Sequence, residues 1–159
     1  MMKDNSAAQK RTIGDAAVDG LLAGTAAGVL MAVYLAAASL TWDSDPMKTL
    51  GLFVPGGVAS PLVGLITHLA VSSVYGLIFG VGWSVLTRVW RGAPAWLAGI
   101  VYGLVLLVFA LAILLPAAES PLLAIPPVHF AIAHALYGLV LGIGLMRRRK
   151  QYTVDSSQY

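Results

Sequence analysis

The sequence predicts an all-α, polytopic membrane protein with four transmembrane helices. Of its 159 residues, 58% are hydrophobic and 11% are charged, whereas soluble domains carry about 25% charged residues. Long charge-free runs separate the charged residues, and a bilayer core of about 30 Å needs about 20 apolar residues in helical form. We therefore expect spans over residues 18–41, 61–87, 93–115 and 127–147. The absence of cysteine excludes disulfide scaffolds and thiolate-held metal centres.

The segments outside the spans are short. The N-terminal tail, residues 1–17, is too polar for a cleavable signal peptide, so the first span should be an uncleaved anchor. The segment 43–60 is apolar, but Pro55, Gly56 and Gly57 interrupt it. We expect this segment to rest in the outer interface of the membrane rather than to cross it. The C-terminal tail, residues 148–159, is basic and then polar.

The distribution of Lys and Arg predicts the orientation. Nine of the ten lie in the two tails or between the second and third spans, and only Lys48 lies on the other side. Positively charged loops stay in the cytoplasm, so both termini should be cytoplasmic. The basic run of Arg147, Arg148, Arg149 and Lys150 fits this topology and should attract anionic lipid. The tails are too short to form a nucleic-acid surface.

An internal repeat relates the second and fourth spans. Residues 72–82 and 134–144 align without gaps and share the pattern YGLxxGxG. The simplest arrangement is two similar helical hairpins, one made by the first two spans and the other by the last two. Both a duplication and convergent packing requirements account for the pattern.

Glycines at four-residue spacing occur in every span. Because lipid offers little hydrophobic drive between helices, small residues promote association by letting backbones approach closely. The first span also carries Ala23, Ala26 and Ala27, so it is small on more than one side. We expect the surplus small face to pack against other integral membrane subunits. The glycines are Gly20, Gly24 and Gly28; Gly76 and Gly80; Gly99 and Gly103; and Gly138 and Gly142.

Charged side chains are expected only outside the spans, which argues against an ion-coupled transporter, a pump or a selective ion channel. No phosphate-binding loop, zinc-protease motif or nucleophile-elbow motif occurs in the sequence. We therefore expect a protein that is not an enzyme and has no catalytic residues.

Polar residues form stripes in the outer halves of two spans. His68, Ser72 and Tyr75 share one face of the second span, and His134 and Tyr137 share one face of the fourth span.

The histidines lie at similar depths. The repeat offsets His68 from His129 by about 1.5 Å and from His134 by about 6 Å along the helix axes. Neutral imidazole is a common metal ligand, so His68 with His129 or His134 could ligate haem b. Contact with a quinone or a lipid is a second interpretation, and hydrogen bonding between helices is the third.

The segments DGLLAGTAAGVLMAVYLA and HLAVSSVYG resemble those of small four-span bacterial membrane proteins of uncharacterised families. This resemblance covers most of the chain. It implies a multi-pass protein of a prokaryotic cytoplasmic membrane, and it implies no activity.

Three functions follow from these observations. The first is a non-catalytic integral membrane subunit that packs by its glycine-rich faces within a larger complex, such as an electron-transfer or energy-transducing complex. The second is a redox subunit that binds haem b or a quinone through His68 with His129 or His134. The third is a small transporter or lipid-binding protein whose cavity is lined by the polar stripes.

Overall fold

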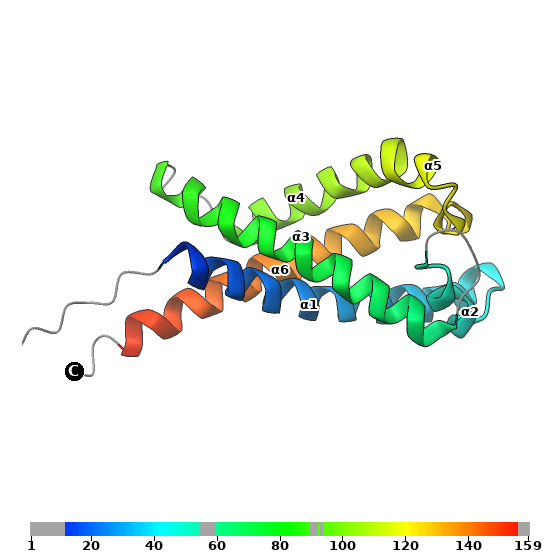
Figure 1. Cartoon of the computed structure of the whole chain (residues 1–159), viewed down its shortest axis with the longest axis horizontal. Coiled ribbons are helices and arrows are strands. Elements are labelled where there is room, and N and C mark those ends of the chain that lie inside the picture. Colours follow the sequence, from blue (N-terminus) through cyan, green and yellow to red (C-terminus); the bar gives the residue numbers. More distant parts are fainter. Residues whose placement is uncertain (1–11, 55–59, 90–91, 93, 156–159) are drawn as a thin grey trace, which may run out of the picture.

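The predicted class of fold is confirmed, because the part of the chain that is described is helical and contains no strand (Figure 1). The computed structural model describes residues 12–54, 60–89, 92 and 94–155. Within these residues, four helical segments are long and apolar enough to cross a membrane. Three are the continuous helices α1 (Ile13–Ala38), α3 (Pro61–Val89) and α6 (Pro127–Asp155).

The remaining span is interrupted. It begins with α4 (Ala95–Phe109), continues through one π-helical turn, η2 (Ala110–Leu114), and ends with α5 (Leu115–Ala117). Short elements join the spans: η1 (Ser39–Trp42), α2 (Pro46–Gly51) and η3 (Pro121–Ala124). The start of α1 and the end of α6 lie at one end of the bundle, here called the terminal end (Figure 1). The opposite end carries α2 and is called the α2 end.

Helix α1 begins earlier than the sequence analysis expected, because a capping box fixes its start. The backbone N–H of Asp15 donates to Thr12 Oγ1 at 3.1 Å, and the backbone N–H of Thr12 donates to the Asp15 carboxylate at 2.8 Å. Asp19 lies inside this helix, as it does inside the expected first span, and is only 3% exposed. The expectation that charged side chains stay outside the spans is wrong at this position. Residues 1–11 of the expected tail lie outside the described residues.

Helix α6 continues beyond the expected end of its span, to Asp155. Part of the expected C-terminal tail is therefore helical. Arg147 is exposed, and the side chains of Arg148, Arg149 and Lys150 lie outside the described residues.

Two pairs of helices pack with their backbones in contact, α1 with α3 and α4 with α6. A Cβ atom placed on Gly24 would lie 2.6 Å from the Ser72 carbonyl oxygen and 2.7 Å from the Gly76 Cα. A Cβ atom on Gly142 would lie 2.7 Å from the Cα of Trp96. Real Cβ atoms do not approach other atoms so closely, so only glycine permits these two helix pairs.

A second side of α1 packs against α6. Ala27 is fully buried, and a Cβ atom on Gly144 would lie 3.0 Å from the Ala23 Cβ. The second small side of α1 is therefore covered within the chain, whereas the sequence analysis reserved it for another protein. Ala26 remains exposed.

Helices α3 and α4 make few contacts with each other and diverge toward the α2 end (Figure 1). Among the described residues, Tyr102 of α4 bridges the two helices: its hydroxyl donates to the Tyr75 carbonyl oxygen at 2.9 Å. The Tyr102 ring also lies 4.9 Å from the Phe79 ring. The four spans thus have three packed interfaces and one open interface, here called the α3–α4 seam.

The glycine contact leaves no room for a side chain between α1 and α3, so one added methyl group should push the two helices apart. Gly24→Ala should lower the free energy of unfolding by about 1–3 kcal/mol, because the new Cβ meets backbone atoms that cannot move independently. Thermal unfolding in mild detergent measures this effect. Gly82→Ala is the matched control, because no atom lies within 4 Å of its Cβ position. Equal melting temperatures for the two variants would contradict the packing described above.

Candidate functional site

The segment after α1 folds back onto the bundle. Asp45 caps α2 by accepting from the Lys48 backbone N–H at 2.8 Å. The Leu50 carbonyl oxygen lies so close to α3 that a Cβ atom on Gly64 would overlap it. Phe53 is 7% exposed, and its ring stacks on the His68 ring with centroids 4.3 Å apart. The described part of the segment therefore packs on the bundle, and its expected position in the outer interface of the membrane stays a prediction. Residues 55–59 lie outside the described residues.

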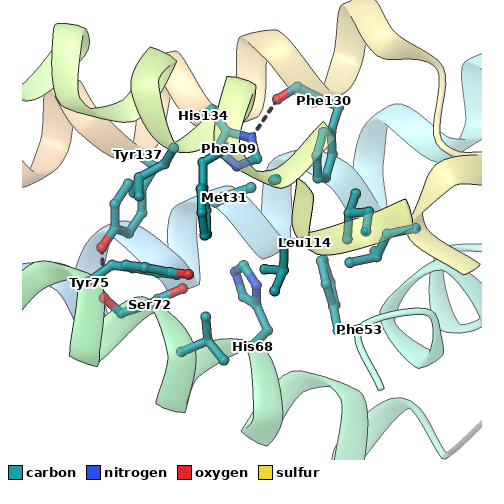
Figure 2. Close-up of a pocket in the computed structure, with 15 residues that line it drawn as sticks. Met31, Phe53, His68, Ser72, Tyr75, Phe109, Leu114, Phe130, His134 and Tyr137 are labelled. Atoms are coloured by element: carbon teal, nitrogen blue, oxygen red, sulfur yellow. Dashed lines mark hydrogen bonds between the residues drawn. The ribbon is translucent and has the colours of Figure 1, made fainter. Parts of the chain in front are cut away.

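A cavity of about 110 Å³ lies between the spans in the half of the bundle near α2. His68, Ser72 and Tyr75 reach it from α3, and His134 and Tyr137 reach it from α6 (Figure 2). The structure thus brings together the two polar stripes that the sequence analysis identified. The rest of the lining is apolar and includes Met31 of α1 and Phe53. Sequence reasoning missed Phe53, because it belongs to a segment that was assigned to the membrane surface.

His68 and His134 are buried, and each uses one ring nitrogen to bond a backbone carbonyl. His68 Nε2 lies 3.1 Å from the Gly28 carbonyl oxygen, and His134 Nδ1 lies 2.9 Å from the Phe130 carbonyl oxygen. A carbonyl oxygen only accepts, so each of these nitrogens must donate its proton. In the neutral imidazole the other nitrogen then carries a lone pair. His68 Nδ1 and His134 Nε2 form no hydrogen bond with any described residue.

The hydroxyl groups near the histidines have different roles. The Tyr137 hydroxyl donates to the Ser72 carbonyl oxygen at 2.7 Å and so ties α6 to α3. The Tyr75 hydroxyl has no hydrogen-bond partner among the described residues, and Tyr75 lines the cavity. The Tyr137 hydroxyl is therefore used in helix packing, whereas the Tyr75 hydroxyl is free to form a hydrogen bond with a ligand in the cavity.

His129 is not part of this site. Its Nδ1 lies 3.0 Å from the Tyr34 hydroxyl, its Nε2 lies 3.1 Å from Thr41 Oγ1, and its ring lies 4.8 Å from the Trp42 ring. These residues join α6 to α1 and to η1, which directly follows α1, and are here called the α1–α6 clasp. The expected pairing of His68 with His129 is therefore not the arrangement found, because both ring nitrogens of His129 are occupied elsewhere.

The volume of the cavity limits what it holds. An engineered apolar cavity of about 150 Å³ accommodates benzene, so 110 Å³ corresponds to a single small ring or a few water molecules. A porphyrin is several times larger than benzene. His68 and His134 line one cavity, but its volume does not fit the macrocycle of haem b. Among the described residues, no cluster of three or more His, Asp or Glu side chains could hold a metal ion.

The cavity opens sideways through the α3–α4 seam. Val71 of α3, Phe109 and Leu114 all line it, and they are 46%, 41% and 42% exposed. Ala110, the first residue of the π-helical turn, also lines the cavity and is 8% exposed. Single π-helical turns frequently mark functional sites. In a membrane this opening faces lipid, so a molecule could enter from the bilayer without crossing water.

The fold and the spans define a four-span α-helical membrane protein. The comparisons with known proteins give its family: residues 14–156 match the model of DUF6789, a family of unknown function, and the chain belongs to that family. No curated protein and no solved structure matches the chain. The expected resemblance to an uncharacterised family is therefore confirmed.

The α1–α6 clasp predicts a structural role for His129. Replacing it with leucine removes two interhelical hydrogen bonds, each contributing about 0.6–1.7 kcal/mol in a membrane. We expect His129→Leu to lower the free energy of unfolding by about 1–2 kcal/mol in detergent. Val128→Leu is the control, because Val128 is the neighbouring residue and is 61% exposed. If both variants unfold like the unmodified protein, the clasp does not contribute to the free energy of unfolding.

Proposed function

We propose that this protein binds the hydroxylated ring of a lipid-soluble quinol in the cavity of His68 and His134. The observation that carries the proposal is the pair of carbonyl bonds that fixes both histidine tautomers. Each neutral imidazole then offers a lone pair to the cavity. Two acceptors call for a ligand with two donors, and the reduced form of a quinone has two hydroxyl groups.

The size and polarity of the cavity support the same class of ligand. Its volume of about 110 Å³ suits a single ring, and apolar side chains surround the few polar groups. Ligand sites commonly have this composition, because the apolar wall supplies affinity and the polar groups fix orientation. An isoprenoid tail attached to the ring would leave through the α3–α4 seam into lipid.

The tautomers also predict which redox form binds. The two carbonyl oxygens of an oxidised quinone are acceptors and would meet two further acceptors at His68 and His134, and the Tyr75 hydroxyl could donate to one carbonyl but not to both. A buried acceptor without a donor costs about 1–3 kcal/mol. We therefore expect the quinol to bind at least about tenfold more tightly than the quinone.

Thermal unfolding of the purified protein with decylbenzoquinol, whose ring carries only its two hydroxyl groups and the alkyl tail, tests this proposal under anaerobic conditions. A ligand at about 100 times its dissociation constant stabilises by about 2.7 kcal/mol, so the melting temperature should rise by about 5–10 °C. Decylbenzoquinone at the same concentration should give a smaller rise.

Two variants locate the binding. Ala110→Phe fills the cavity without removing a polar group, and it should abolish the response to decylbenzoquinol. Val74→Phe is the control, because Val74 is 57% exposed on α3 and does not line the cavity. The proposal fails if neither redox form stabilises the protein, or if Ala110→Phe responds like Val74→Phe.

A non-catalytic integral membrane subunit of a larger complex is the second candidate function. One observation favours it: the span that contains α4 is the least buried of the four spans. Its side turned away from α6 offers a continuous apolar surface with exposed Leu104, Val108 and Ile113. A partner helix could pack there without disturbing the bundle.

Extraction in mild detergent tests the subunit candidate. A subunit should co-purify with defined membrane proteins in a fixed ratio, and Leu104→Trp together with Val108→Trp should reduce their recovery by at least about tenfold. The subunit candidate fails if the protein purifies without partners. It also fails if Leu104→Trp together with Val108→Trp leaves the amount of protein in the membrane and the recovery of partners unchanged.

A further inference from the structure

The wall of the histidine cavity that lies opposite the α3–α4 seam is formed in part by α1. The packed interfaces run from α3 through α1 and α6 to α4, so α1 and α6 face the seam across the bundle. Met31 of α1 lines the cavity, and in the view of Figure 2 it lies between the rings of His68 and His134. A ring that enters through the seam therefore meets the Met31 side chain at the opposite wall.

Met31 has little room to move away from a ligand. It is 6% exposed, and Ala27 and Leu35, one helical turn before and after it on α1, are fully buried. Phe53 and Phe130, which also line the cavity, are 7% and 4% exposed. Because protein interiors are close-packed, a side chain displaced from this wall would have to push its neighbours.

We propose that Met31 makes the cavity selective for quinols of a single ring over quinols of two fused rings. This inference rests on the proposed function. In a para-quinol the two hydroxyl groups lie at opposite corners of the ring, which leaves two free edges. With the hydroxyl groups on His68 and His134, one edge faces the seam and the other faces Met31. The tail leaves by the first edge, because the seam side of the lining includes exposed Val71 and Phe109.

A naphthoquinol carries its second ring on the edge opposite the tail. That ring would need the space that the Met31 side chain fills. The cavity of about 110 Å³ already suits no more than one small ring, since about 150 Å³ accommodates benzene. Extra atoms forced into a packed interior are unfavourable, so the naphthoquinol should bind at least about tenfold more weakly than the benzoquinol. Turning the ligand over would place the longer tail against Met31 and would relieve nothing.

Thermal unfolding with two ligands under anaerobic conditions tests the inference. One is decylbenzoquinol, and the other is a para-naphthoquinol that carries the same decyl tail beside a hydroxyl group. For the unmodified protein, the naphthoquinol should need at least about tenfold higher concentration to give the same rise in melting temperature. Affinities that agree within about threefold would overturn the inference and leave the quinol site itself in place.

Substitutions of Met31 should reverse the selectivity. Met31→Ala removes every side-chain atom beyond Cβ, and it should raise the affinity for the naphthoquinol at least about tenfold, with a smaller gain for decylbenzoquinol. Met31→Val leaves a smaller cavity and replaces Met31→Ala if that variant does not fold. Met146→Ala is the matched control. It removes the same atoms toward the terminal end of α6, where Met146 is 38% exposed and does not line the cavity, and it should leave both affinities unchanged.

The outcomes distinguish this inference from the proposed function. If neither ligand stabilises the unmodified protein or the Met31 variants, the quinol site fails and the selectivity fails with it. If decylbenzoquinol binds, but the naphthoquinol gains no affinity in a folded Met31 variant, the role of Met31 is overturned while the quinol site stands. A gain for the naphthoquinol that Met146→Ala does not reproduce supports the inference.

Discussion

The glycine contacts between helix backbones are the constraint on which the rest of the molecule depends. In a membrane, helices gain little from hydrophobic burial and associate through close packing. Gly24 and Gly76 let α1 and α3 approach until backbone atoms touch. That approach also brings His68 of α3 within hydrogen-bond distance of the Gly28 carbonyl oxygen of α1. A wider helix pair would leave the imidazole without this acceptor, and its tautomer would no longer be fixed.

The same constraint explains why one interface stays open. Helix α1 uses one small side for α3 and another for α6, and α6 uses its glycines for α4. The chain of contacts therefore runs from α3 through α1 and α6 to α4, and α3 and α4 are the two ends of this chain. Tyr102 reaches across between them, to Tyr75 and Phe79. The histidine cavity opens along this seam because, within the described residues, no glycine contact joins α3 to α4.

Much of the fold could be predicted from the sequence, because charge-free runs of known length are enough to locate membrane spans. The pairing of His68 with His134 was the alternative that helical spacing left open, because depth along the helices matched His68 best with His129. Hydrogen bonding between helices, one of the three interpretations, is the role that the structure gives His129. Depth alone could not select it, because depth does not specify the direction of a side chain around the helix axis. Phe53 was missed because Pro55 and the following glycines marked its segment as a surface element. Pro116 carried a signal for the π-helical turn, since proline disturbs the hydrogen bonds of the preceding helical turn.

The chemistry of the cavity at the α3–α4 seam follows from which hydrogen bonds its polar residues complete within the chain. Near α2, His68 and His134 donate to carbonyl oxygens and so keep lone pairs free in an apolar cavity. The proposed quinol would supply donors to these two lone pairs through its two hydroxyl groups. This proposal rests on the helix packing, because the close approach of α1 to α3 gives His68 the carbonyl acceptor that fixes its tautomer. The glycines that join the helices therefore also decide which hydrogen-bonding group the cavity presents.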